Sequence, residues 1–334
     1  MLPRVLSVFE PFILTLLGTV VLASLLPARG AMVPFFHGAS LAGIVLLFFL
    51  HGAKLSREAI LSSVRNWQLH LAVFAATYVL FPLLGLGLIS LSAIPSLPVI
   101  AGPVAAGMLF LTLLPSTVQS SIAFTSIARG NVAAAVCSAS LSNLIGVILT
   151  PALVALLMQG SGTGGGGVTF ASVEAIFGQL LLPFVAGHLM RPLIGDWVHR
   201  QKKLVTLVDR GSILLVVYTA FGAAVVEGLW HRLGASDLAV ILVLCSVLLA
   251  IVLTATCGAA RLLRFSREDA IVLLFCGSKK SLASGVPMAG VLFPASQVGM
   301  VILPVMLFHQ LQLIACAIIA RRLADGAETA GRDL

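Results

Sequence analysis

Two adjacent lysines, Lys279 and Lys280, interrupt an otherwise apolar stretch that covers residues 270–293. In a lipid environment an unpaired lysine costs about 2.5–3.5 kcal/mol, so a lysine at that depth usually faces a cavity or a partner. The alternative is that both side chains extend along the helix to the membrane surface. No aspartate or glutamate occurs in the interior of any of the long apolar stretches. Backbone carbonyls, serine hydroxyls or a bound anion are therefore the predicted partners of these ammonium groups, above all of Lys279.

Both lysines lie in one of two helices that the sequence predicts to be broken. The first break is Leu114–Ser121 (LPSTVQSS), and the second is Phe275–Ser281 (FCGSKKS), which is followed by Pro287. Proline removes a backbone donor, and unwound backbone at membrane depth is tolerated only inside protein or beside a watery cavity. Breaks at matching places in two halves of a chain indicate a transporter's binding site, with half-helix N-termini for anions and freed carbonyls for cations. The alternative is two kinks that only help the helices to pack.

Polar side chains also cluster in the apolar stretch that follows each break. The spacing places two triplets each on one helix face: Ser138, Ser142 and Asn143, and His309, Gln310 and Gln312. Such residues often only hold helices together, at about 0.6 kcal/mol each. Thr77, five residues before Pro82, is a weaker candidate. The candidate substrate- and ion-binding residues are Thr77, Ser116, Thr117, Gln119, Ser120, Ser121, Ser138, Ser142, Asn143, Gly277, Ser278, Lys279, Lys280, Ser281, His309 and Gln310.

The composition determines which solvent surrounds these segments. Of the 334 residues, 59% are hydrophobic and 10% are charged, and the mean hydropathy is +1.11, whereas a soluble domain has roughly 25% charged residues. Lipid must therefore surround most of the chain, and the long unbroken apolar runs predict helices rather than barrel strands. The net charge of +8 indicates basic loops and not nucleic-acid binding. The five cysteines form no CxxC pair, so neither disulfides nor a metal site is predicted.

Counting runs of roughly 20 apolar residues predicts an all-α membrane protein with ten transmembrane helices. These spans lie near residues 12–28, 38–53, 69–90, 101–128, 132–158, 171–190, 211–229, 238–257, 270–293 and 298–320. The Gly-rich linker 159–169 falls midway between residues 1–158 and 170–322, each of which is predicted to form a five-helix repeat. Residues 323–334 are predicted to form a cytoplasmic tail.

The basic residues predict the orientation of these spans. If the N-terminus is cytoplasmic, 16 of the 20 lysines and arginines lie in inner loops and only Arg29 and Arg232 lie in outer loops. This asymmetry predicts a multi-pass protein of a bacterial inner (plasma) membrane with both termini cytoplasmic and the Gly-rich linker outside. Because each half has an odd number of spans, the two repeats are predicted to be inverted relative to each other.

The segments around both breaks resemble the bile acid:sodium symporter family, and especially its branch of solute carrier family 10 member 7, which has bacterial members. The likeness rests on Leu113–Asn131 (LLPSTVQSSIAFTSIARGN), Cys137–Pro151 (CSASLSNLIGVILTP) and Phe275–Met288 (FCGSKKSLASGVPM), and it extends over nearly the whole chain. It implies a panel of spans 1, 2, 6 and 7 and a core of spans 3, 4, 5, 8, 9 and 10, in which the broken spans 4 and 9 cross. It also implies two sodium ions behind the crossing and organic anions that enter between core and panel.

The chain departs from this family at the implied sodium sites. Phe275 stands where the bile acid carriers have a sodium-ligating glutamate, Lys279 replaces their glutamine, and Ser120–Ile122 covers their Ser-Asn pair. Sodium needs oxygen ligands, and a nearby ammonium repels it. We therefore predict that Lys279 takes the place of the coupling ion, so that transport is uncoupled or proton-coupled. The alternative is a sodium ion held near Ser120, Ser121, Ser138 and Ser142.

These observations predict a secondary active transporter that moves an organic, preferably anionic, solute by alternating access. The predicted partners are a small-molecule solute and the lipid bilayer, with no nucleic acid. No cofactor is predicted other than a sodium ion or proton as coupling ion, and the sequence is compatible with a homodimer. The alternatives are sodium:bile acid-type symport, a non-transporting membrane regulator, and a membrane enzyme with a Ser–Lys dyad. Ser278 or Ser281 with Lys279 has the composition of such a dyad.

Overall fold

The computed structural model describes residues 11–54, 66–92, 103–158, 177–228 and 234–330, and within these ranges the chain is helical and has no strands. The Gly-rich linker 159–169 lies outside the described residues. The helices of the first half are α2 (Pro11–Leu25), α3 (Met32–Lys54), α5 (Trp67–Ala75), the π-helical turn η2 (Ala76–Leu80), α6 (Phe81–Ser92), α7 (Pro103–Leu113), α8 (Gln119–Ile127) and α9 (Val132–Leu157). Those of the second half are η3 (Phe177–Leu181), α11 (Leu182–Arg200), α12 (Lys202–Val226), α14 (Ala235–Leu262), α15 (Arg267–Gly277), α16 (Leu282–Leu292) and α17 (Ala295–Ala330).

Six helical segments among the described residues are long and apolar enough to cross a membrane. They are Met32–Lys54, Trp67–Ser90, Val132–Leu157, Lys202–Val226, Ser236–Leu262 and Ala295–Asp325. Two further apolar helices, Leu14–Leu25 and Val104–Leu113, are shorter. The described helices overlap all ten predicted ranges, while the number of membrane crossings stays a prediction.

Both predicted helix breaks are confirmed, and several boundaries differ from the prediction. One helix ends at Leu113 and the next begins at Gln119; likewise α15 ends at Gly277 and α16 begins at Leu282. The sixth element continues to Arg200 rather than 190, and α17 continues to Ala330, so the tail expected from residue 323 is largely helical. Hydropathy marks where a helix leaves the apolar layer, whereas the helix ends only where its backbone hydrogen bonds end.

The molecule has an apolar exterior, and its largely apolar interior also holds a set of fully buried polar side chains. Large apolar side chains stand exposed on the outer helix faces, such as Leu193 (81%) and Leu262 (83%). Ser116, Lys280 and Gln312 are instead fully buried. This arrangement suits a chain that lipid surrounds, because apolar surface costs nothing there while polar groups need partners inside.

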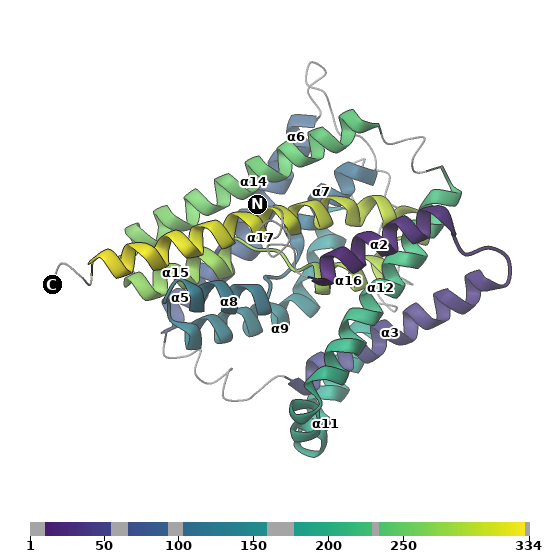
Figure 1. Cartoon of the computed structure of the whole chain (residues 1–334), viewed down its shortest axis with the longest axis horizontal. Helices are drawn as coiled ribbons and strands as arrows, with labels where there is room; N and C mark the ends of the chain where they lie inside the picture. The colour runs from purple at the N-terminus through teal and green to yellow at the C-terminus, as the bar shows by residue number, and fades with distance from the viewer. Residues whose placement is uncertain (1–10, 55–65, 93–102, 159–176, 229–233, 331–334) are drawn as a thin grey trace.

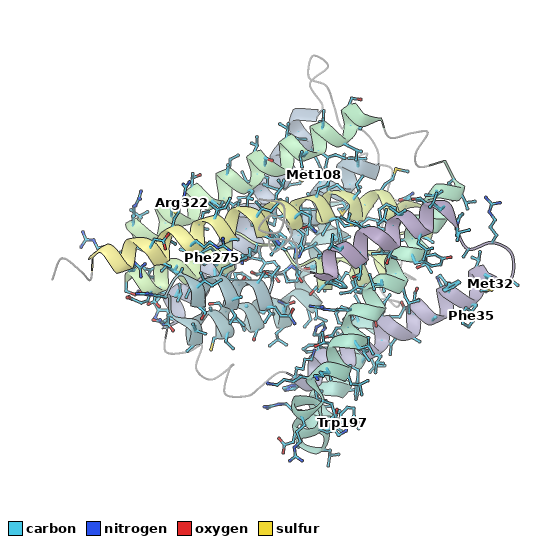
Figure 2. All side chains as sticks on the ribbon, in the orientation of Figure 1. Met32, Phe35, Met108, Trp197, Phe275 and Arg322 are labelled. Carbon is cyan, nitrogen blue, oxygen red and sulfur yellow. The ribbon has the colours of Figure 1, made fainter. Side chains whose placement is uncertain are left out.

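The helices pack in two groups that Figure 1 places side by side. In one group α3 packs on α11 and α12, and α2 packs on α12. In the other group α17 contacts α7, α8 and α14, while α15 lies against α5, α8 and α9. Figure 2 shows Met32 and Phe35 at the outer end of α3, whereas Phe275 lies within the second group. The groups meet where α12 contacts α16 and α17.

Candidate functional site

The first break is held by side chains of α9. The hydroxyl of Thr150 donates to the carbonyl of Leu113 (2.8 Å), the amide nitrogen of Ser116 donates to Ser142 Oγ (3.1 Å), and Asn143 Nδ2 donates to the carbonyl of Ser116 (2.7 Å). Helix termini and breaks leave backbone groups without intrahelical partners. Ser142 and Asn143, two of the predicted residues, therefore replace hydrogen bonds that the unwound segment has lost.

The two breaks contact each other directly, as predicted. Ser116 Oγ donates to the carbonyl of Cys276 (2.6 Å), and the backbone nitrogen of Ser281 donates to the carbonyl of Pro115 (2.8 Å). Both bonds use groups that an unbroken helix would have satisfied internally. Asn143 joins the contact from α9, because its Oδ1 accepts from Ser284 Oγ at 2.8 Å.

Lys280, and not Lys279, meets the carbonyls of the facing break. Its ammonium donates to the backbone oxygens of Thr77 (2.8 Å), Thr112 (2.8 Å) and Leu114 (2.7 Å), and it lies 4.1 Å from the ring centre of Phe81. Hydrogen bonds from a charged donor are stronger than those between neutral groups. Thr77, the weakest of the candidates, takes part through its carbonyl, while its hydroxyl donates within its own helix to Val73.

Lys279 has a different environment, so the prediction that carbonyls or serine hydroxyls hold its ammonium is wrong for the described residues, while a bound anion stays a prediction. Its ammonium lies 4.1 Å from the ring centre of Phe124 and 5.3 Å from that of Phe275. It makes no hydrogen bond with any of the described residues, although it is fully buried. Aromatic faces attract a cation but offer it no acceptor comparable to a carbonyl.

Gln312 fixes the backbone of Lys280 from α17. Its Oε1 accepts from the Lys280 nitrogen (2.8 Å), and its Nε2 donates to the Lys280 carbonyl (2.9 Å) and to His309 Nδ1 (2.8 Å). Because Nδ1 accepts, the neutral imidazole of His309 carries its proton on Nε2. Gln310, the predicted neighbour, makes no side-chain hydrogen bond with the described residues, so Gln312 is the member of this triplet that the candidate set missed.

The serines predicted to accompany a sodium ion each have a protein partner. Ser120 Oγ bonds with Thr117 Oγ1 (2.8 Å), Ser121 Oγ donates to the Phe275 carbonyl (2.9 Å), Ser138 Oγ bonds with His70 Nδ1 (2.8 Å), and Ser142 Oγ accepts from Ser116. Within the described residues, no three His, Cys, Asp or Glu side chains gather as metal ligands.

The glycine and serine that precede the lysines act through packing and local bonding. A Cβ at Gly277 would lie 3.1 Å from that of Ala76, so glycine lets α15 approach the third predicted span closely. Ser278 Oγ donates to the carbonyl of Leu274 (2.5 Å), and Ser281 Oγ caps α16 by accepting from the nitrogen of Ser284 (3.2 Å).

A cavity of about 300 Å³ opens between the breaks and the group formed by α3, α11 and α12. Predicted residues that line it are Thr117, Gln119, Ser120, Asn143, Ser281 and His309. The half-helices α8 and α16 both begin at its wall, at Gln119 and Leu282. Their N-terminal amides carry partial positive charge, which favours an anion.

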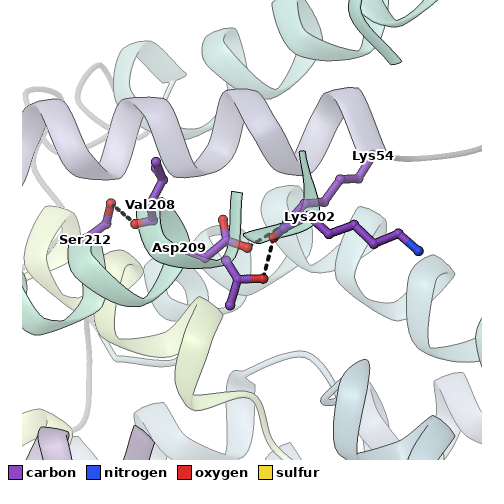
Figure 3. Close-up of polar contacts among 6 residues, drawn as sticks. Lys54, Lys202, Val208, Asp209 and Ser212 are labelled. Atoms are coloured by element: carbon purple, nitrogen blue, oxygen red, sulfur yellow. Dashed lines mark hydrogen bonds and ion pairs between the residues drawn. The ribbon is translucent and has the colours of Figure 1, made fainter. Parts of the chain in front are cut away.

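Three charged residues outside the candidate set also line this cavity. Lys54 of α3 and Asp209 of α12 form an ion pair at 2.6 Å (Figure 3). Arg210, the next residue of α12, lines the same cavity. The pairing of two residues 155 positions apart has no local sequence signal. Apolar side chains make up much of the remaining wall: Leu47, Phe48, Leu144, Val147, Phe184 and Ile213.

Comparison with known proteins identifies the family. The model of the SBF-like CPA transporter family matches residues 10–325. The chain belongs to this family. It is 54% identical over 320 residues to "Putative symporter YfeH" of Escherichia coli, covering 96% of this chain and 94% of that protein. It is 53% identical to PA2026 of Pseudomonas aeruginosa (97% and 96% covered) and 24% identical to "Sodium/bile acid cotransporter 7" of Rattus norvegicus (84% and 81% covered).

The expected relationship to the bile acid:sodium symporters is thereby confirmed, and the chain is a multi-pass membrane protein of a transporter family. In this SBF-like transporter the residues of the suggested Ser–Lys dyad do not interact. Ser278 and Ser281 bond elsewhere, and the Lys279 ammonium bonds to neither of them.

Proposed function

We propose that this chain is a secondary transporter that moves a compact organic anion by alternating access. The observation that carries the proposal is the cavity beside both breaks, into which two half-helix N-termini open. Its volume of about 300 Å³ lies at the lower end of the range for small-molecule sites. The apolar wall suits the body of the solute, and the N-termini with the basic rim of Lys54 and Arg210 suit its charged group.

The arrangement of the helices supports the two-part division that the sequence suggested. We propose ten spans in two inverted repeats, with α2, α3, α11 and α12 in a panel and the remaining spans in a core. The cavity between these groups is then the place where a rocking motion exposes the solute to one side or the other. The proposed substrate- and ion-binding residues are those of the crossing and of the cavity wall, with Gln312 added and Gln310 left out.

We further propose that transport does not require sodium. The family resemblance places Phe275 where the carriers have their glutamate, and the Lys279 ammonium lies 5.3 Å from the ring centre of Phe275. Lys279 is the candidate proton carrier, because no described hydrogen bond holds its ammonium. The titratable groups that face it are Cys276, Cys316 and His309. Sodium symport with ligands near Ser120, Ser121, Ser138 and Ser142 is the alternative.

Flux through reconstituted protein tests this function. Proteoliposomes would be loaded with one labelled carboxylate at a time (octanoate, benzoate or naphthoate), and exchange would be measured against the corresponding unlabelled anion and against its uncharged amide. We expect saturable exchange for at least one carboxylate and none for the amide. Absence of exchange for every anion, from protein that is folded and correctly inserted, would favour a non-transporting regulator.

A further inference from the structure

The environment of the Lys280 ammonium has the composition of a monovalent-cation site. Three backbone oxygens, those of Thr77, Thr112 and Leu114, lie within 2.8 Å of Nζ and match its three N–H donors. No carboxylate forms an ion pair with it in the described part of the chain, where Lys54 and Asp209 pair with each other. Rings of backbone carbonyls are the ligands with which proteins replace the hydration shell of small monovalent ions.

Each of the three carbonyl oxygens can accept from Lys280 because a helix irregularity leaves it without a backbone N–H donor. In the π-helical turn Ala76–Leu80, the nitrogen of Phe81 bonds to the carbonyl of Ala76, five residues earlier. The next bond of that register would run from residue 82 to Thr77, but Pro82 has no N–H. The Thr77 carbonyl is thereby left for Lys280.

The other two oxygens lie at the start of the first break, that of Thr112 in the last turn of α7 and that of Leu114 directly after this helix. An α-helical bond to the Thr112 carbonyl would come from the nitrogen of Ser116, which donates to Ser142 instead. The carbonyl of Leu114 follows the last residue of α7 and precedes the start of α8 at Gln119. Two separate irregularities, in the third and fourth predicted spans, therefore aim carbonyls at one point inside the protein.

We propose that these carbonyls form a latent monovalent-cation site that Lys280 fills from within the chain. Its ammonium acts as a tethered cation that joins the π-turn, the first break and the second break, and Gln312 holds its backbone in place from α17. This role of Lys280 lies in the assembly of the crossing and does not depend on transport. The experiment therefore measures protein stability and not flux.

Removal of the side chain leaves three oxygen dipoles that repel one another unless a cation enters. The Lys280→Ala variant lacks a propylammonium group, so the n-propylammonium ion is the matching probe and n-propanol is its uncharged control. The full chain, purified in detergent, would be unfolded thermally in the chlorides of propylammonium, ammonium, sodium, potassium and choline at constant ionic strength. Lys279→Ala is the matched control, because Lys279 is equally buried and lacks the carbonyl partners.

We expect a lower Tm for Lys280→Ala in choline, by about 5 °C or more, and saturable recovery of most of that loss by propylammonium but not by propanol. The wild type and Lys279→Ala are expected to show no such recovery. If Lys280→Ala cannot be isolated, purification in propylammonium would restore monodisperse protein. A Lys280→Met variant as stable as wild type would overturn the proposal, and so would rescue by propanol alone or failure of every cation to rescue.

Discussion

Asn143 provides the sharpest test of how the crossing is held, because one amide bonds to both breaks. Its Nδ2 donates to the carbonyl of Ser116 (2.7 Å), and its Oδ1 accepts from Ser284 Oγ (2.8 Å). In Asn143→Ala the carbonyl of Ser116, which is fully buried, loses its partner. Ser284 keeps a bond with Ser281.

An orphaned buried carbonyl costs about 1–3 kcal/mol, and the lost bond to Ser284 about 1 kcal/mol more. Asn143→Ala should therefore be destabilised by about 2–4 kcal/mol, and for a chain of this length its Tm should fall by about 3–6 °C. The assay is thermal unfolding of the detergent-purified chain. Ser140→Ala is the control, since Ser140 lies one helical turn away on the same cavity wall and makes no side-chain hydrogen bond with the described residues.

Asn143→Asp separates the hydrogen bond from the charge. Its carboxylate would still accept from Ser284, but it would face the carbonyl of Ser116 with no proton to donate. A negative charge about 5 Å from a bound anion costs about 3 kcal/mol at an effective dielectric constant near 20, or roughly 100-fold in affinity. The reasoning is refuted if Asn143→Ala unfolds at the wild-type temperature, or if Asn143→Asp binds the transported anion as well as wild type does.

Three further predictions address the packing, the rim and the coupling ion. Gly146→Ala should lose about 1–3 kcal/mol, because its Cβ would lie 2.6 Å from Tyr78 Oη and 2.7 Å from Pro115 Cβ; Gly87→Ala, with open space around it, should lose nothing in the same unfolding assay. Asp209→Asn should raise the affinity for the transported anion by about 3–10-fold and Lys54→Met should lower it, because these charges line the cavity. A binding titration in which both variants change the affinity in the same direction would contradict an anionic solute. Replacement of sodium by potassium or choline should change neither uptake nor Tm of the wild type, because an ammonium already occupies the carbonyl cage; saturable stabilisation by sodium alone would show that a sodium site exists.

Much of the fold could be predicted from the sequence, because lipid makes hydropathy and helix length nearly equivalent. The two breaks could also be predicted, because Pro115 with its polar neighbours and Gly277 with the two lysines are unusual inside apolar runs. The polar face of α9 follows from helical periodicity alone, which is why Ser142 and Asn143 were found. The ion pair of Lys54 with Asp209 could not be predicted, because it depends on which helices become neighbours in the fold.

The partners of the two lysines could not be assigned from the sequence. Residues 279 and 280 follow the end of a helix, and the direction of each side chain depends on the exact residue at which the helix ends, which sequence patterns locate only to within one or two positions. The observed end at Gly277 sends the Lys280 ammonium to three carbonyls and the Lys279 ammonium between two phenylalanine rings. One signal was nevertheless present, in the five-residue spacing from Thr77 to Pro82. In a π-helical register that spacing leaves the carbonyl of Thr77 without a backbone donor, and a buried carbonyl without a donor in lipid requires another partner. With the π-helical turn that the structure shows, the third predicted span requires a donor that it does not itself contain, and Lys280 provides it.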